Sequence, residues 1–190
     1  MSPQEDRARP GSDPDDRHTE RLVALGQVIE LSVAMESRLR QAFCVLVESK
    51  YAAVVAGGQA AEWLIEQSKA LVDAHHDMPD VDRQAIKAAL NRCKAANEQR
   101  NHLAHSVAVG VKFNPAFQMV RSRRQRYSSD IRSFTLTEIR AAANELQSAG
   151  ATLATVMTKV VGPDLVDIGE ALALEDLLAD EDLLAEDSPE

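Results

Sequence analysis

The chain has 190 residues, of which 45% are hydrophobic, 27% charged and only 4% aromatic, with 8 Gly and 7 Pro. This composition fits one domain with tails, and it argues against β-sandwiches, β-barrels and low-complexity chains. No run approaches the ~18 apolar residues of a membrane helix, and the N-terminus has no apolar signal segment, so we expect a cytoplasmic protein without a membrane partner. The net charge is −9, but no Lys or Arg follows Pro163 and many of the acidic residues do, which leaves the preceding part close to neutral.

The first helix is the longest element that the sequence predicts. Residues 1–18 hold several Pro and acidic residues and almost nothing apolar, so we expect a disordered N-terminal segment. Thr19 is the expected N-cap of a helix that runs to about Lys50. Two apolar rows follow this helix, one with Leu22, Leu25, Ile29, Ser32, Glu36, Leu39, Phe43 and Leu46, the other with Val28, Leu31, Met35, Ala42 and Val45. Two rows indicate burial on more than one side, as in a bundle or at an oligomer seam, and we expect a homodimer.

Two more helices follow. Gly57 and Gly58 break the helical pattern, and a second helix is expected over residues 59–76. Asp80 can then cap a third helix over residues 81–104. Both helices carry apolar residues at helical spacing, so we expect them to pack with the first.

The chain changes character before its last helix. Residues 106–113 alternate with period 2, and residues 117–120 follow after a turn, which predicts a small β-hairpin-like insertion. Thr137 is the expected cap of a fourth helix that ends at about Val161. The sequence thus predicts an all-α domain over residues 19–163, with four helices and an insertion before the last.

Residues 164–190 form an acidic, Leu-rich tail with a short internal repeat, in which residues 175–180 resemble residues 181–186. One interpretation is a solvated, weakly helical tail. The other is an interaction segment that binds a regulatory protein or masks a basic groove of the same chain. The sequence is compatible with both interpretations of the tail.

The densest polar cluster, residues 98–105, lies at the end of the third predicted helix. At about 100° per residue, Arg100 falls near the centre of the apolar face made by Ile86, Ala89, Cys93, Ala96 and Leu103. A guanidinium at such a position must be paired or must border a wet cleft. The simple alternative is an Arg that bridges a carboxylate such as Glu36 of the first helix.

The run Arg100-Asn101-His102-Leu103-Ala104-His105 resembles the motif of the HEPN superfamily, named for higher-eukaryote and prokaryote nucleotide-binding domains. The resemblance covers about residues 20–161. It implies an antiparallel four-helix bundle that dimerises, so that the motif Arg and His of both subunits face one cleft and cleave RNA without metal. Arg100 and His105 match these positions, Asn101 fills the polar position, and His102 lies at a variable one. The resemblance also implies a bacterial toxin–antitoxin or antiviral defence setting.

These residue types suit RNA cleavage on chemical grounds. The 2′-hydroxyl of RNA is the nucleophile, and a His with an ordinary pKa of ~6.5 can act as base or acid. A planar guanidinium stabilises the charge that develops on the phosphate. We therefore expect an endoribonuclease that needs no cofactor and leaves 2′,3′-cyclic phosphate ends. Arg100, Asn101 and His105 are the expected catalytic residues, with Glu36 and His102 as possible supporting residues.

Other features allow different interpretations. Arg121, Arg123, Arg124 and Arg126 form a basic run that could hold an RNA backbone or stay a solvated loop. Glu98, His102 and His105 share one helix face and could bind zinc, but we expect no metal because no remote ligand cluster is evident. Cys44 and Cys93 are expected to be reduced core thiols.

The main alternative function is a non-catalytic helical dimer that binds a partner protein or a nucleotide, with the acidic tail as interaction segment. The position of Arg100 discriminates between the two functions. An open cleft across a two-fold axis favours the ribonuclease, whereas a guanidinium sealed against Glu36 within one subunit favours the alternative.

Overall fold

The computed structural model describes residues 14–104, 107–109, 117–122 and 129–162. Helices make up most of the described residues, which confirms the all-α class. They are α1 (Pro14–Val47), α2 (Ala52–Ala56), α3 (Ala61–Ala74), α4 (Asp80–Ala104) and α5 (Leu136–Val161). None of the helices in this part of the chain is long and apolar enough to cross a membrane.

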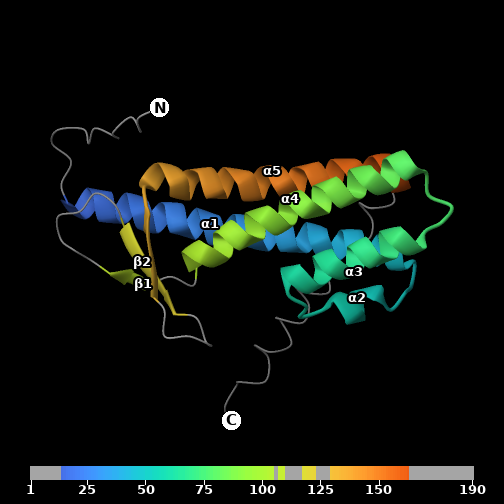
Figure 1. Cartoon of the computed structure of the whole chain (residues 1–190), viewed down its shortest axis with the longest axis horizontal. Coiled ribbons are helices and arrows are strands. Elements are labelled where there is room, and N and C mark those ends of the chain that lie inside the picture. The colour runs from blue at the N-terminus through green and yellow to red at the C-terminus, as the bar shows by residue number, and fades with distance from the viewer. Residues whose placement is uncertain (1–13, 105–106, 110–116, 123–128, 163–190) are drawn as a thin grey trace, which may run out of the picture.

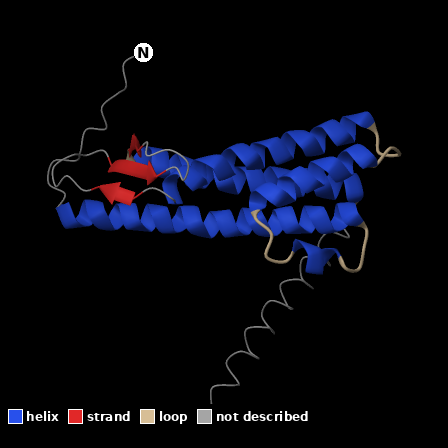
Figure 2. Ribbon diagram, turned by 60° about the horizontal axis from the view of Figure 1, so that its bottom comes forward, coloured by secondary structure: helices blue, strands red, loops and turns tan. Residues whose placement is uncertain are grey.

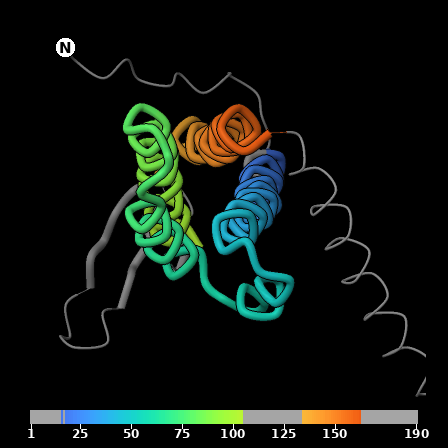
Figure 3. The backbone as a smooth tube through the Cα atoms, turned by 90° about the vertical axis from the view of Figure 1, so that its right-hand side faces the viewer, coloured from blue at the N-terminus to red at the C-terminus, as the bar shows by residue number. Residues whose placement is uncertain are grey.

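Four of the helices lie side by side, and Figure 1 shows α1, α4 and α5 along the length of the molecule. The end-on view in Figure 3 places α5 between α1 and α4, with α3 beside α4. The short α2 lies outside this group and contacts α1. The His75 ring at the end of α3 makes a 2.9 Å hydrogen bond with the Leu46 carbonyl oxygen at the end of α1. The start of α4 therefore lies near the end of α1, and the two helices run antiparallel.

The apolar spacing of α5 explains its central position. Its buried residues recur every three or four positions, as expected for a helix buried along one side, and include Ile139, Ala143, Leu146, Leu153 and Met157. Gly150 lies at a close approach of α5 to α1. A Cβ added there would lie 3.0 Å from Arg38 Nη1 and 3.5 Å from Met35 Cα. A small residue at this point allows the two helices to pack closely.

The caps of α5 differ in part from expectation. Thr135, and not Thr137, is the N-cap: its Oγ1 accepts a hydrogen bond from the Glu138 amide, and the Glu138 carboxylate accepts one from the Thr135 amide. This reciprocal pair satisfies two amides that a helix start leaves without intrahelical partners. At the other end, Gly162 has φ 99°, a backbone conformation that glycine adopts without a steric penalty.

The start of α1 and the burial of its apolar rows also differ from expectation. The helix begins at Pro14, five residues before Thr19, and proline suits the first helical position because its φ is preset. Leu22 and Ile29, expected in the core, are exposed, whereas Val28 is buried. The reason is tertiary: α4 ends at Ala104, only four residues past the contact between Arg100 and Glu36, so it does not cover the first half of α1.

Between α4 and α5 the described residues include three strands, one more than a hairpin needs. They are β1 (Val107–Val109), β2 (Phe117–Ser122) and β3 (Ser129–Phe134), paired antiparallel in the order β1-β2-β3. The backbone register opposes Val107 to Val120 and Arg121 to Asp130. Figure 2 shows the strands in red at the end of the molecule where α1 and α5 begin. The predicted N-terminal segment before Pro14 and the tail 164–190 lie outside the described residues.

Candidate functional site

Arg100 is the charged residue that lies closest to the core on α4. Its Nη2 donates to Glu36 Oε1 on α1, and its Nη1 donates to Asn101 Oδ1 at 3.0 Å. The side chains of Arg100 and Glu36 are 18% and 19% exposed. The apolar pattern of α4 predicted this guanidinium on the buried face of the helix, where it needs a partner of opposite charge. A carboxylate from the neighbouring helix is that partner.

Glu36 is shared between two guanidinium groups. Its other oxygen, Oε2, lies 3.9 Å from Arg40 Nη2, one helical turn further along α1. The carboxylate thus faces Arg100 on one side and Arg40 on the other, so the local balance is one negative charge against two positive charges. A cluster with a net positive charge at the rim of a helical core is suited to an anion such as phosphate.

Two buried polar atoms near this cluster have no hydrogen-bond partner among the described residues. One is the donor Arg100 Nε, and the other is the acceptor Asn97 Oδ1, one turn earlier on α4. Asn97 is buried within the helical core. A buried polar atom without a partner costs about 1–3 kcal/mol, so such atoms are uncommon in purely structural positions. These two polar atoms make this stretch of α4 less stable than apolar side chains at the same positions would make it.

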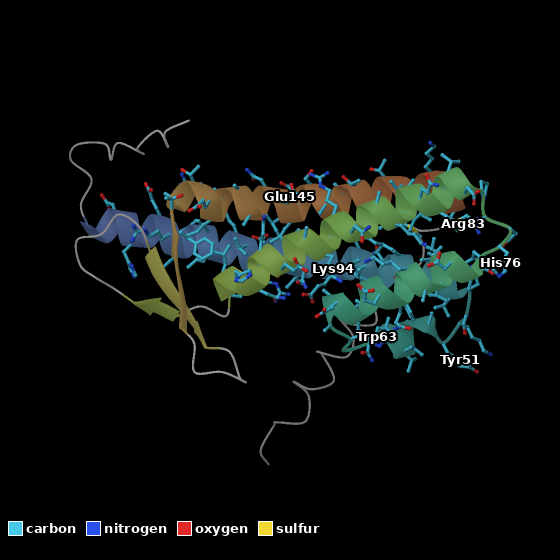
Figure 4. The ribbon with its side chains drawn as sticks, viewed as in Figure 1. Tyr51, Trp63, His76, Arg83, Lys94 and Glu145 are labelled. Carbon is cyan, nitrogen blue, oxygen red and sulfur yellow. The ribbon has the colours of Figure 1, made fainter. Side chains whose placement is uncertain are left out.

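A second arginine on α4 has a different environment. Arg92 Nε and Nη2 donate to both oxygens of Glu145 on α5, at 2.7 and 3.1 Å. Its Nη2 also donates to Ser148 Oγ and its Nη1 to Thr152 Oγ1. This two-pronged hydrogen bond holds the pKa of the Glu145 carboxyl below its ordinary value. Figure 4 labels Glu145 on α5.

The Arg92 network and Arg40 were not identified from the sequence, although both carry a signal. Glu145, Ser148 and Thr152 occupy one face of α5 at i, i+3 and i+7, and Glu36 and Arg40 are an i, i+4 pair. Side chains at these spacings meet on a helix surface. These spacings do not indicate which helix supplies the partner residue, since Arg92 is 53 residues away from Glu145 along the chain.

The expected site residues are only partly within the described residues. Arg100, Asn101, Glu36 and His102 are described, and the first three meet at one point. His105, Arg123, Arg124 and Arg126 lie outside the described residues, and Arg121 is described only as a backbone position of β2.

A cavity of about 540 Å³ opens on the other side of the α4 end, against the start of α5. Its polar lining comes from Gln99, His102, Glu138 and Glu145, and its apolar lining includes Leu103 and Phe134. Glu138 already serves the α5 cap and Glu145 already binds Arg92. His102 therefore faces a different space from Arg100, which separates it from the Arg100 cluster.

The part of the chain that the structure describes holds few groups suited to metal or thiol chemistry. No group of three His, Cys, Asp or Glu side chains there could hold a metal ion. Cys44 and Cys93 are free and buried, as expected for core thiols. Burial raises the pKa of the Cys93 thiol to about 11, so the reactive thiolate is disfavoured.

Comparisons of the chain with family models, with curated proteins and with solved structures find no match.

Proposed function

We propose that the chain is a metal-independent endoribonuclease of HEPN type, built as an antiparallel four-helix bundle with a β insertion before α5. The observation that carries the proposal is the Arg100 guanidinium. It lies at the rim of the helical core, four residues before α4 ends, bound to Glu36 and Asn101, and its Nε has no partner in the described part of the chain. The run Arg100-Asn101-His102-Leu103-Ala104-His105 supplies the motif to which that guanidinium belongs.

The contacts of Arg100 leave it able to bind phosphate. A guanidinium has five N–H donors, and the contacts to Glu36 and Asn101 use one on each terminal nitrogen. One further N–H on Nη1 and one on Nη2 have no partner among the described residues. N–H donors of a positioned guanidinium can bind phosphate oxygens and stabilise the charge of a pentacoordinate phosphorus. Glu36 acts in this proposal as the residue that positions Arg100.

His105 supplies the proton transfers in the proposed reaction. A base removes the proton of the ribose 2′-hydroxyl, whose oxygen then bonds to the adjacent phosphorus. The bond from phosphorus to the 5′ oxygen breaks, and that oxygen takes a proton from an acid. The products are a 2′,3′-cyclic phosphate and a 5′-hydroxyl. A homodimer supplies two His105 side chains, one for each role, and the resemblance suggests a toxin or phage-defence setting.

RNA contacts outside the reacting phosphate are assigned to the basic run. Arg121, Arg123, Arg124 and Arg126 are proposed to hold the RNA backbone, because contacts to phosphate dominate sequence-independent affinity. The acidic tail 164–190 is proposed to bind a regulatory protein. Neither role is needed for the cleavage step itself.

The contact between Arg100 and Glu36 within one subunit is the outcome expected for a second candidate, the non-catalytic helical dimer that binds a partner protein or nucleotide. Both side chains are largely buried within one subunit, as expected for an ion pair that only joins α1 to α4. In that case the orphaned Arg100 Nε is a cost of packing, and no RNA reaches the guanidinium.

An RNA cleavage assay separates the two candidates. We expect the full chain to cleave single-stranded RNA, and Arg100→Gln and His105→Ala each to lower the rate by at least about 100-fold. Lys94→Ala is the matched control, because Lys94 is a cation on the same helix that pairs with Glu66 on α3 instead (Figure 4). We expect this control to cleave at the wild-type rate.

Two further readouts sharpen the assay. Glu36→Gln keeps a hydrogen-bond acceptor for Arg100 but removes its charge, so a lower rate indicates that Glu36 positions Arg100. EDTA should leave the rate unchanged, whereas a loss that zinc restores would favour a zinc site with Glu98, His102 and His105. A full chain without activity, or equal activity in all variants, would overturn the ribonuclease proposal in favour of the non-catalytic dimer.

A further inference from the structure

Arg40 is a partly buried cation that has no hydrogen bond to any residue the structure describes. Its side chain is 34% exposed, and its Nη2 lies 3.9 Å from Glu36 Oε2, which is longer than a hydrogen bond. Arg92 and Lys94 have similar exposure, 40% and 39%, but both donate hydrogen bonds to a carboxylate of a neighbouring helix. The fold therefore uses Arg92 and Lys94 to join helices, whereas it leaves the five N–H donors of Arg40 to other contacts.

The Glu36 carboxylate lies between Arg40 and Arg100. Its Oε1 accepts a hydrogen bond from Arg100 Nη2, and its Oε2 faces Arg40. Because each guanidinium lies against a different oxygen, the two guanidinium groups form two separate binding points for anions. One carboxylate balances only one of the two positive charges. The remaining positive charge is partly shielded from water, where attraction to an anion is stronger than at an open surface.

The start of α3 explains why Arg40 is accessible to solvent. The rings of Phe43 on α1 and Trp63 on α3 lie 5.3 Å apart, which places the first turn of α3 beside Phe43. The two helices run in the same direction (Figure 1), so Arg40, about one turn before Phe43, lies level with the start of α3 at Ala61. Arg40 thus lies at the edge of the cover that α3 provides, and it is more exposed than Arg100, which is 18% exposed.

We propose that Arg40 binds the phosphodiester next to the one that Arg100 binds, so that the site holds two successive phosphates of one RNA strand. This inference rests on the proposed function, which supplies the RNA and the role of Arg100. Successive phosphates are two single negative charges separated by one ribose, and Arg100 and Arg40 are two cations separated by one carboxylate. A terminal phosphate instead concentrates its charge on one phosphorus and has no second group for Arg40.

This arrangement defines the class of substrate. The smallest RNA that uses both cations has two phosphodiesters, as in a trinucleotide without terminal phosphates. A dinucleoside monophosphate has only the reacting phosphodiester, so it contacts Arg100 and leaves Arg40 unused. Contacts to phosphate carry no information on the base sequence, so Arg40 contributes to affinity for a single strand of any sequence.

The first test measures binding without cleavage. The probe is a single-stranded RNA with 2′-O-methyl groups at every position, which lacks the 2′-hydroxyl nucleophile, and the protein is the full chain. We expect Arg40→Gln to raise the dissociation constant about 10-fold and to make the slope of log affinity against log salt concentration shallower by about 0.7, as for the loss of one phosphate contact. Arg40→Lys keeps the charge and should recover most of the affinity.

Arg140→Gln is the matched control for these measurements. Arg140 also lies beside a carboxylate beyond hydrogen-bond distance, at 4.0 Å from Glu20 Oε2, and it is 57% exposed. Glu20 precedes Glu36 by 16 residues on α1, or about 24 Å along the helix. This substitution removes the same charge from the chain at a remote position, so the affinity and the salt dependence should stay at the wild-type values.

The second test compares the cleavage of two unmodified substrates, a trinucleotide and a dinucleoside monophosphate. For the trinucleotide, Arg40→Gln should raise KM about 10-fold and leave kcat within about twofold of the wild type, because Arg40 contacts a phosphate that does not react. For the dinucleoside monophosphate, Arg40→Gln should leave both KM and kcat unchanged.

The outcomes separate this inference from the proposed function. Wild-type affinity of Arg40→Gln for the methylated RNA, or weaker binding with an unchanged salt slope, would mean that Arg40 only balances the charge of Glu36, and the inference is then wrong. An equal loss on both cleavage substrates would place Arg40 at the reacting phosphate instead of its neighbour and would also contradict the inference. A chain that binds the methylated RNA through Arg40 but cleaves no RNA would uphold the Arg40 contact and overturn the proposed activity.

Discussion

Two arginines of α4, two turns apart, bind carboxylates of neighbouring helices in different ways. Arg92 lies at the surface, 40% exposed, and all three of its nitrogens donate to Glu145, Ser148 or Thr152 on α5. Arg100 is more buried, binds Glu36 on α1, and keeps a buried Nε without a partner in the described part of the chain.

The difference shows what each arginine is suited for. The four hydrogen bonds that Arg92 donates all reach α5, so Arg92 acts as a link between α4 and α5. Arg100 is held in place by Glu36, but its hydrogen-bonding capacity is not used up. Spare donors on a positioned guanidinium are of no benefit to packing, whereas they are useful for binding an anion. This contrast leads us to assign function to Arg100 and structure to Arg92.

The largest effect on stability is expected at Arg100. Arg100→Met keeps a long apolar side chain but leaves the half-buried Glu36 with Arg40 alone, which should lower the free energy of unfolding by about 1–3 kcal/mol. Arg100→Met with Glu36→Leu removes both charges and should recover stability to within about 1 kcal/mol of the wild type. Urea unfolding followed by circular dichroism measures both. A double variant no more stable than the single one would show that the ion pair itself stabilises the fold.

A smaller loss is expected at Arg92. Arg92→Met removes more hydrogen bonds than Arg100→Met does, but the Glu145 carboxylate is exposed enough to be hydrated in their place. The same urea titration should therefore show a smaller decrease than for Arg100→Met, and RNA cleavage should be unchanged. A larger decrease in the free energy of unfolding for Arg92→Met than for Arg100→Met would contradict the expectation that burial of the ion pair decides the size of the loss.

The smallest effect is a change in pH dependence. The hydrogen bonds from Arg92 hold the pKa of Glu145 below 4.5, its ordinary value. The unfolded chain then binds the proton more readily, so this contribution to stability is complete above about pH 4.5 and is lost as the pH falls through the folded value. Glu145→Gln should flatten the stability profile in this acid range and leave it unchanged near neutral pH. An unchanged acid slope would indicate that other carboxylates dominate it.

Local signals in the sequence predicted some elements well. The start of α4 at Asp80 and the extent of α5 from Leu136 to Val161 agree with the apolar spacing and with the Gly162 stop. The Thr135 cap was also readable, because Thr135 and Glu138 form the Ser/Thr-x-x-Glu pattern of a capping box. Choosing Thr137 placed the cap two residues too late, since the reciprocal bond needs a Glu three residues after the cap.

The sequence predicted a buried arginine with a carboxylate partner at the candidate site, but not all of the contacts around it. The 3.6-residue period put Arg100 on the buried face of its helix, which required a partner, and Glu36 was the carboxylate considered. The i, i+4 spacing of Glu36 and Arg40 was a further local signal. Only the fold shows that Arg100 Nε has no partner among the described residues. This depends on the position of α4 along α1, which no local pattern determines.

The sequence by itself determined the four long helices and the buried face of α4, because helical periodicity and caps act over a few residues, but it did not predict the short α2. Tertiary structure decided which apolar residues of α1 are covered. Leu22 and Ile29 have the same spacing as the buried Leu39 and Leu46, but α4 ends before it reaches them. Burial depends on where the neighbouring helices end, and that is set by contacts between residues far apart in the chain.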